Sequence, residues 1–370
     1  MIGILFIACA VIYAITFLGY FVGLGVAFNY KAQPYTSDLN ASVIIAFRNE
    51  ASSLSQLLDS LLIQTDQNFQ LILVNDHSSD HYLSIIRQYE EHFLDFQLID
   101  LDQQEGKKEG IRTGVCAAKY ELIITTDADC ILPLNWVNHW KESFKKNAHL
   151  KLAAGIVTLT GNTFFEKLQQ LEFASLIASS IGAANNDKAI MLNAANMAYR
   201  KEFYLEVSEG LDAIPSPTGD DIFLLEACKK KYPNGFAYLQ ETSLMVNTAA
   251  KKTLKDFLLQ RKRWASKTKY YVDVQMKRVA FVVAITSLLI LIGGIGSFFY
   301  YRLWLPFLIL FVVKLIVDYS LLHRYLKGIQ QLNLLNYFLI VELILPIYTI
   351  FVGITSQLGG YTWKDRTYSN

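Results

Sequence analysis

Long apolar stretches lie at both ends of the chain and leave a region of mixed composition between them. The first stretch, residues 2–28, contains no charged side chain. A helix of about 20 apolar residues crosses the roughly 30 Å hydrocarbon core of a bilayer. This stretch is longer than the apolar part of a secretory signal peptide, and no basic segment precedes it. We therefore expect a retained N-terminal transmembrane anchor over residues 1–30.

Further apolar runs near the C-terminus predict a transmembrane region of about three helices over residues 279–358, followed by a tail over residues 359–370. The runs cover residues 279–301, 303–322 and 336–358. The middle run holds Lys314 and Asp318 one helical turn apart, and their pairing would lower the cost of placing them in lipid. This run either spans the membrane or lies partly in the interface. The choice decides on which side the tail emerges.

Between these ends, residues 35–250 alternate between short β-branched runs and segments with helical spacing. Residues 41–47 and 70–74 are predicted strands, and regularly spaced leucines predict a helix over residues 52–63 between them. The alternation of helix and strand continues over residues 81–92, 96–99, 107–118 and 121–125. The pattern predicts an α/β domain with a parallel sheet and helices on both of its faces.

Polar residues follow three of the predicted strands directly. These clusters are Arg48-Asn49-Glu50, Asn75-Asp76-His77-Ser78-Ser79-Asp80 and Asp127-Ala128-Asp129. Open parallel sheets bind ligands beyond the carboxyl ends of their strands, which is where these clusters would lie. No glycine-rich loop follows the first predicted strand. This argues against a dinucleotide-binding Rossmann domain and against a P-loop nucleotidase.

Three features carry candidate chemistry, and each has a structural alternative. Asp127 and Asp129 have the spacing with which two carboxylates share Mg²⁺ or Mn²⁺, although such acidic pairs are common. Asp220 and Asp221 precede an apolar segment and would otherwise cap a helix. Residues 251–278 contain Gln260-Arg261-Lys262-Arg263-Trp264 and would otherwise form only an amphipathic helix at the membrane interface.

Charge and cysteine content narrow the class of protein. The chain has 34 Lys and Arg against 33 Asp and Glu, without the basic excess of a nucleic-acid binder, so we expect no nucleic-acid partner. Its four cysteines form no CxxC pair, which indicates a reducing compartment. Lysines and arginines crowd into residues 251–278, next to an apolar run, and such cations are retained on the cytoplasmic side. We expect an integral protein of the cell (inner) membrane, with a cytoplasmic catalytic domain and with membrane lipids against the basic segment.

Taken together, these residues resemble the membrane-bound glycosyltransferases of family 2, which include cellulose, chitin and hyaluronan synthases and ceramide glucosyltransferases. The resemblance rests on an ordered set of motifs: Glu50, Asp76, the DxD of Asp127 and Asp129, the acid pair Asp220 and Asp221, and Gln260-x-x-Arg263-Trp264. It implies a GT-A fold for residues 35–250. It also implies a nucleoside-diphosphate sugar donor, a divalent metal and inversion at the anomeric carbon.

The resemblance assigns roles to four acids on the donor side. Asp76 resembles the carboxylate that reads the nucleoside base, and Glu50 resembles an acid that shapes the same pocket. Their structural alternatives are an Asx turn for Asp76 and a helix cap for Glu50. Asp129 is similar to the direct metal ligand, and Asp127 to a carboxylate that contacts the nucleotide or, indirectly, the metal.

Cationic and amide side chains complete the implied donor site. Gln260 and Arg263 match the family's contacts to the diphosphate. Lys107 or Lys108 resembles a lysine near the same group, and the sequence leaves open which of the two it is. All four side chains are suited to the negative charge of a diphosphate.

The catalytic and acceptor residues follow from the same resemblance. Asp221 matches the catalytic base, with Asp220 beside it, because a sugar or lipid hydroxyl needs a proton acceptor when it attacks. Trp264 matches the position where an acceptor ring stacks. Asn196 lies in a segment that resembles the acceptor side, although its small neighbours also suit a tightly packed strand.

We therefore expect an inverting glycosyltransferase of the hexosyltransferase type that moves a sugar, as a UDP-sugar, to a lipid or lipid-linked acceptor. Few predicted membrane helices argue against a channel for a growing glycan. A processive polysaccharide synthase is the alternative enzyme. A non-catalytic membrane protein that only binds nucleotide is the third possibility, although every acid that the mechanism needs is present.

Overall fold

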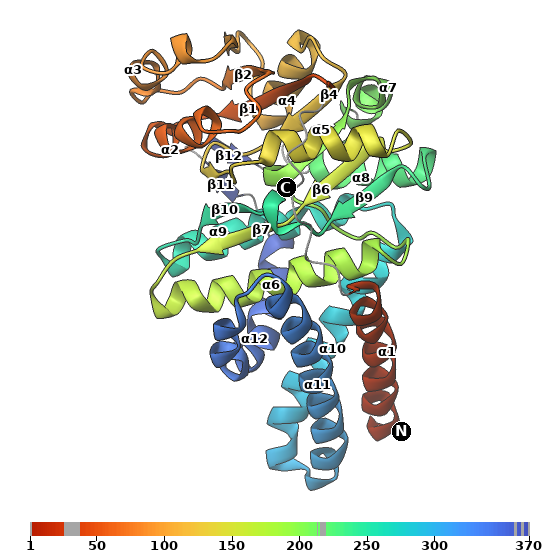
Figure 1. Cartoon of the computed structure of the whole chain (residues 1–370). Coiled ribbons are helices and arrows are strands. Elements are labelled where there is room, and N and C mark those ends of the chain that lie inside the picture. Colours follow the sequence, from red (N-terminus) through yellow and green to blue (C-terminus); the bar gives the residue numbers. More distant parts are fainter. Residues whose placement is uncertain are drawn as a thin grey trace. The chain divides into compact units, whose positions relative to one another are not determined.

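The computed structural model describes residues 2–25, 38–212, 214, 220–358, 361–363 and 366–368. The chain forms two compact units, which we call the sheet unit and the helical unit (Figure 1). The sheet unit comprises Ala27–Leu159 and Leu192–Ala249. The helical unit comprises Met1–Val26, Thr160–Met191 and Ala250–Asn370.

A seven-stranded sheet forms the centre of the sheet unit (Figure 1). Its strands, in spatial order, are β3 (Asp95–Asp100), β2 (Phe69–Asn75), β1 (Ala41–Phe47), β4 (Leu122–Thr125), β8 (Met197–Arg200), β6 (Leu152–Gly155) and β9 (Phe236–Leu239). The first four strands are parallel, and β1, β2 and β4 are buried along their whole length. This confirms the predicted α/β arrangement and explains the continuous apolar runs of these strands.

The sheet differs from the expected parallel one in its second half. Strand β8 runs antiparallel to both β4 and β6, while β6 and β9 are parallel. A second sheet of three strands combines β5 (Cys130–Ile131), β10 (Val246–Ala249) and β7 (Val157–Thr160). Pairing with a strand some 70 residues later in the chain leaves no local sequence pattern, which is why periodicity alone does not predict it.

Close packing of one helix on the sheet depends on two glycines. The helices of the sheet unit are α2 (Ala51–Leu62), α3 (Tyr82–Ile86), α4 (Lys107–Ala117), α5 (Trp136–Lys146), α7 (Lys201–Asp212) and α8 (Asp220–Lys231), with short 3₁₀ turns at Glu90–His92, Ala194–Asn196 and Thr242–Leu244. A Cβ added at Gly110 would lie 2.8 Å from the Cβ of Ala46, and one at Gly114 would strike Ile44. Helix α4 therefore lies directly on β1, which brings Lys107 to the carboxyl end of that strand.

The helical unit contains the apolar helices that the sequence predicts. Its elements are α1 (Ile2–Gly23), α6 (Phe164–Ala184), α9 (Leu254–Ala265), α10 (Val274–Phe299), α11 (Trp304–Gly328), α12 (Phe338–Gln357), 3₁₀ turns at Ser266–Tyr270, Tyr301–Leu303 and Leu332–Tyr337, and the hairpin of β11 (Tyr361–Trp363) and β12 (Arg366–Tyr368). Among the described residues, four helical segments are long and apolar enough to cross a membrane: Gly3–Gly23, Val274–Phe299, Tyr301–Gly328 and Leu332–Gln357. Within this unit, α1, α10 and α11 extend side by side from α6 (Figure 1).

Charged side chains inside these helices are satisfied by one another. Lys314 donates to Asp318 at 2.6 Å, as its one-turn spacing predicts. Glu342 of α12 also pairs with Lys314, and the hydroxyl of Tyr13 donates to Asp318 at 2.7 Å. The cluster joins α1, α11 and α12, so the cost of burying each charge is offset by partners from other helices.

Helix α6 packs with the apolar helices, although the predicted boundaries place it in the 35–250 domain. It crosses the end of α1 at two glycines: a Cβ added at Gly182 would lie closer than 3.0 Å to the carbonyl oxygen of Tyr20, and one at Gly23 would strike Gly182. Asn185 and Asn186 donate to the carbonyl oxygens of Gly23 and Gly19 at 2.9 and 2.8 Å. The bond to Gly23 thereby satisfies a carbonyl that the end of a helix leaves without a partner.

We expect Gly182→Ala to lower the thermal stability of the purified protein, because a single methyl group would force α6 away from α1. Overpacking of this kind costs about 1–3 kcal/mol. Gly19→Ala is the matched control, since a Cβ there meets nothing within 4 Å. Unfolding temperatures in detergent measure the difference. Equal stability of the two variants would contradict this account of the crossing.

The two ends of α12 contact helices α6 and α9 of the same unit. Tyr337, just before it, lies 5.7 Å from Phe164 of α6 between ring centroids. At the other end, the carbonyl oxygen of Leu358 accepts a hydrogen bond of 3.2 Å from Lys262 of α9. Helices α6 and α9 are themselves joined by contacts, including Phe165 to Phe257 at 5.8 Å. One end of α12 thus contacts α6, and the other end contacts α9.

Candidate functional site

The ends of three strands meet at one edge of the large sheet. Phe47 at the end of β1 pairs with Asn75 at the end of β2, and Ile44 pairs with Thr125 at the end of β4. The polar clusters that follow these strands therefore start at the same edge. Arg48 joins the first two, because its guanidinium donates to the carbonyl oxygens of Asp76 and His77 at 2.9 and 3.0 Å.

The loops after β1 and β2 are fastened to each other by side chains to which the sequence assigned no role. Asn49, in a left-handed conformation with φ 50°, accepts a hydrogen bond from the backbone N–H of Ser79 at 2.8 Å. The carboxylate of Asp80 accepts from the N–H of Ala51 at 2.7 Å. The sequence could have indicated this role, because Asn49 and Asp80 lie in polar runs directly after strands, and Asn and Asp are the residues that close such turns.

The two acids predicted for the nucleoside pocket occupy these loops. Asp76 is only 2% exposed, and its backbone N–H donates to the carbonyl oxygen of Phe47 at 2.8 Å. Glu50 stands at the N-cap position of α2, and its carboxylate accepts a hydrogen bond from the hydroxyl of Ser53 at 2.7 Å. The helix-cap alternative thus describes the place of Glu50, and its carboxylate makes no capping bond to the α2 backbone.

The structure distinguishes the two lysines that the sequence left open. Lys107, at the first position of α4, forms an ion pair with Asp127, and both side chains are partly exposed. Lys108 instead donates to the carbonyl oxygen of Leu211, at the end of α7, at 2.5 Å. Lys107 is therefore the lysine that lies at the DxD, whereas Lys108 holds a neighbouring helix.

The charges of the two DxD carboxylates affect the neighbouring Cys130. Burial raises the pKa of the Cys130 thiol well above its ordinary value, and the charges of Asp127 and Asp129 raise it further. Among the described residues, no group of three or more His, Cys, Asp or Glu side chains forms a complete metal cage. Two carboxylates suit a cation that takes its remaining ligands from water and substrate phosphates, as Mg²⁺ does in many transferases.

The acid pair lies in the first turn of a helix in the sheet unit, where acidic side chains are favourable. Helix α8 starts at Asp220, and the carboxylate of Asp221 accepts from the N–H of Ile222 at 2.9 Å. Asp221 is half-buried. The side chain of Asp220 and the preceding Pro217-Thr218-Gly219 lie outside the described residues.

Asn196 has a packing role in the structure and not the predicted contact with an acceptor. It is fully buried, and its Oδ1 accepts from the indole N–H of Trp136 at 2.8 Å. Its amide nitrogen donates to the carbonyl oxygens of Ile156 and Leu244 at 2.8 and 2.6 Å. A side chain that is fully buried and has both its amide atoms bonded to protein groups presents no polar atom to a substrate. The alternative of a tightly packed strand is the one that the structure supports.

The remaining motif lies in the other compact unit. Gln260, Arg263 and Trp264 are on α9 of the helical unit, and all three are half-buried. The ring of Trp264 lies 5.9 Å from that of Phe173 on α6. The structure therefore brings the strand-end clusters together in one unit and the Gln-x-x-Arg-Trp motif in another.

Comparison with known proteins gives a family match for part of the chain. Residues 42–207 match the model of a family described as Glycosyl transferase family 2. The chain carries a family 2 glycosyltransferase domain. The match includes Glu50, Asp76, Lys107 and the DxD, and it ends before the acid pair and the motif on α9.

Relatives with known names match somewhat more than a third of the chain. The poly-beta-1,6-N-acetyl-D-glucosamine synthase of Staphylococcus epidermidis is 30% identical over 137 residues, which are 37% of this chain and 33% of that protein. The synthase of the same name from Staphylococcus aureus (strain COL) is 28% identical over 135 residues, or 36% of this chain and 32% of that protein. The match thus spans about a third of the length of these relatives.

A solved structure with the same overall fold covers nearly the whole chain. It is a mannosyltransferase from Pyrobaculum calidifontis, determined with GDP-mannose and Mn²⁺. The TM-score is 0.57 at 14% identity, over 97% of this chain and 99% of that one. The family 2 domain therefore has a mixed α/β sheet of the GT-A type, with apolar helices before and after it, as the resemblance implied.

Proposed function

We propose that this protein is a membrane-bound inverting glycosyltransferase that moves a sugar from a UDP-sugar to a lipid or lipid-linked acceptor. The observation that carries the proposal is the ion pair of Lys107 with Asp127, at the sheet edge to which Arg48 ties the loop of Asp76. This edge combines a cation with acids inside a family 2 domain. A nucleoside diphosphate needs both, because it carries negative charge and donors that acids recognise.

The proposed reaction requires a base and stabilisation of the leaving group. Asp221 accepts the proton of the acceptor hydroxyl while the oxygen forms a bond to C1 and the bond from C1 to the diphosphate breaks. Lys107 faces the negative charge that develops on the diphosphate. Gln260, Arg263 and Trp264 keep their predicted roles towards diphosphate and acceptor on the family resemblance.

A divalent cation fits the DxD in this proposal. Asp129 would hold the ion directly and Asp127 would support it. The bound ion supplies positive charge that stabilises the departing diphosphate. Mn²⁺ in the mannosyltransferase of the same fold supports this choice.

The acceptor separates the two candidate enzymes. The four helical segments that could cross a membrane, among the described residues, leave little room for a glycan channel, which favours a lipid acceptor and transfer of one or a few sugars. A processive polysaccharide synthase is the second candidate, and the names of the staphylococcal relatives favour it. Those names also make UDP-N-acetylglucosamine the first donor to test.

Release of nucleoside diphosphate by purified protein tests the proposal. The protein is incubated in detergent with Mn²⁺ and one of several sugar nucleotides, without an added acceptor. We expect slow release from one UDP-sugar and faster release when total lipid is added. Binding of a sugar nucleotide without any release, with or without lipid, would instead support a non-catalytic role.

The proposed membrane topology has α1, α10 and α11 as crossings, with α12 returning to its starting side. One end of α12 contacts α6 and the other end contacts α9, and these two helices contact each other, which supports this path. The tail over residues 359–370 would then emerge on the same side as α9, which we propose to be the cytoplasmic side. Four full crossings would leave the tail on the opposite side.

We expect a cysteine placed after Asn370 to react with a membrane-impermeant maleimide only after the cells are opened. The parent protein carries Cys116→Ser, because Cys116 is an exposed thiol. A cysteine introduced at Tyr301, between α10 and α11, is the matched control and should react in intact cells. Reaction of the C-terminal cysteine in intact cells would refute the returning path of α12.

A further inference from the structure

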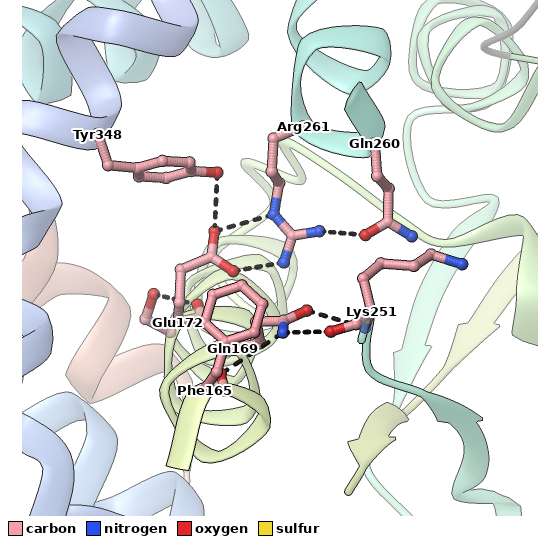
Figure 2. A network of polar contacts seen from close by, with 8 residues as sticks. Phe165, Gln169, Glu172, Lys251, Gln260, Arg261 and Tyr348 are labelled. Atoms are coloured by element: carbon pink, nitrogen blue, oxygen red, sulfur yellow. Dashed lines mark hydrogen bonds and ion pairs between the residues drawn. The ribbon is translucent and has the colours of Figure 1, made fainter. Parts of the chain in front are cut away.

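A buried arginine occupies the first of the two unspecified positions in the Gln-x-x-Arg-Trp motif. Arg261 is 3% exposed and pairs with Glu172 of α6 (Figure 2). The contacts are 2.5 Å from the guanidinium NH2 to Oε2 and 3.2 Å from Nε to Oε1. This is a two-point ion pair, the geometry for which a planar guanidinium is suited and an ammonium is not.

The same guanidinium contacts a motif residue on each side of it. Its third nitrogen, NH1, donates to the side-chain oxygen of Gln260 at 2.6 Å (Figure 2). Its plane also lies over the ring of Trp264, with 4.3 Å between the guanidinium carbon and the ring centroid. Arg261 therefore contacts both the amide proposed for the diphosphate and the ring proposed for the acceptor.

A second layer of contacts holds Glu172 and α9 in place. The hydroxyl of Tyr348, on α12, donates to Oε1 of Glu172 at 3.3 Å (Figure 2). Gln169, one turn earlier on α6, exchanges hydrogen bonds of 2.8 and 2.9 Å with the backbone of Lys251, just before α9. The network thus links α9 to α6 and to an apolar helix through buried groups. A buried charge that loses its partner is costly, so these side chains have little freedom to reorient.

We propose that Arg261 is a positioning residue of the transferase, which orients the amide of Gln260 and the ring of Trp264 through its ion pair with Glu172. The inference rests on the proposed function, because those two side chains are proposed to meet the substrates. It adds a role for a residue to which neither the motif nor the family match assigns one. Through Tyr348 it also makes the orientation of both side chains depend on the packing of α12.

The role predicts energetic coupling, which a purely structural arginine would not show. Arg261→Lys keeps the charge, and it removes the two-point pair together with the bond to Gln260. We expect kcat/KM to fall about 10- to 100-fold, the scale on which small displacements of reacting groups act. In a Gln260→Ala background, and separately in a Trp264→Phe background, the same substitution should cost at least about threefold less.

The controls separate positioning from loss of fold. Lys255→Gln removes an exposed cation from the same helix and should leave kcat/KM within about twofold of the parent. Tyr348→Phe removes a hydroxyl that contacts both Glu172, at 3.3 Å, and Arg261, and we expect a folded protein with a smaller loss of the same kind. Unfolding temperatures and the fraction of protein that binds UDP correct each rate for inactive protein.

Two outcomes would overturn the inference. Only the second would also refute the proposed function. Full activity of Arg261→Lys, or losses that simply multiply in both double variants, would show that Arg261 does not orient its neighbours. In those cases the parent still turns over donor, so the proposed function stands. If the parent itself turns over no sugar nucleotide, both the proposed function and this inference are refuted.

Discussion

Replacement of Asp221 by asparagine is expected to abolish transfer while the protein still binds the sugar nucleotide. Asparagine keeps the shape and the hydrogen bond to the N–H of Ile222, so helix α8 should still begin correctly. It cannot accept a proton, and loss of a general base costs about 10²–10⁴ in rate. Donor affinity by calorimetry and initial rates of sugar transfer measure the two effects separately.

Glu209→Gln serves as the control for Asp221→Asn, because it neutralises an exposed acid of α7 in the same unit. We expect it to retain the parental rate. A collapse of donor affinity in Asp221→Asn, with normal turnover of the donor that still binds, would place Asp221 in the donor site. The base would then have to be another residue, and Asp220 would be the first to test.

Replacement of Asp129 by alanine is expected to remove metal-dependent activity. The loss should be about 10²–10³ in kcat, the cost of removing one group that stabilises charge in the transition state. Asp127→Asn should cost less, because it changes the partner of Lys107 and leaves the direct ligand in place. Rates across a titration of Mn²⁺, and binding of Mn²⁺ in the presence of UDP, measure both variants.

EDTA provides the complementary test of the metal. The parent enzyme should lose activity in EDTA and regain it when Mn²⁺ is added in excess. If Asp129→Ala turned over donor at the parental rate in EDTA, neither the metal nor this carboxylate would be needed. The Lys107 side chain would then be the main source of positive charge at the DxD.

Features with a short period in the sequence were predictable. Strands β1, β2 and β4 are buried on both faces, so they appear as continuous apolar runs that end in polar residues. The apolar helices were predictable from their uninterrupted apolar runs, since each run is long enough to cross a bilayer. The pairing of Lys314 with Asp318 follows from their spacing of one helical turn.

Features that depend on distant parts of the chain were not predictable from such patterns. Glu342 joins Lys314 across 28 residues, and only the packing of α12 on the other helices brings them together. Glu172 was the available signal for the Arg261 network, because a buried acid in the middle of a helix needs a partner. Which residue supplies that partner depends on tertiary structure.

The boundary of the sheet domain illustrates the same limit. Residues 164–184 have apolar side chains all around the helix and not on one face, which is typical of a helix that packs against neighbours on more than one side. Composition alone does not say whether those neighbours are a sheet or other helices. The glycine contacts at Gly23 and Gly182 show that α6 packs on α1.

The most direct test of the central claim is the product that purified protein makes from a labelled UDP-sugar and membrane lipid. The protein is incubated with Mn²⁺ and lipid extract. The products are separated into organic and aqueous phases, and their molecular masses are measured by mass spectrometry. We predict a lipid that gains one or a few sugars, with the label in the organic phase, and no such product from Asp221→Asn. A long water-soluble polymer, made by this chain without added lipid, would contradict the account and establish a processive synthase.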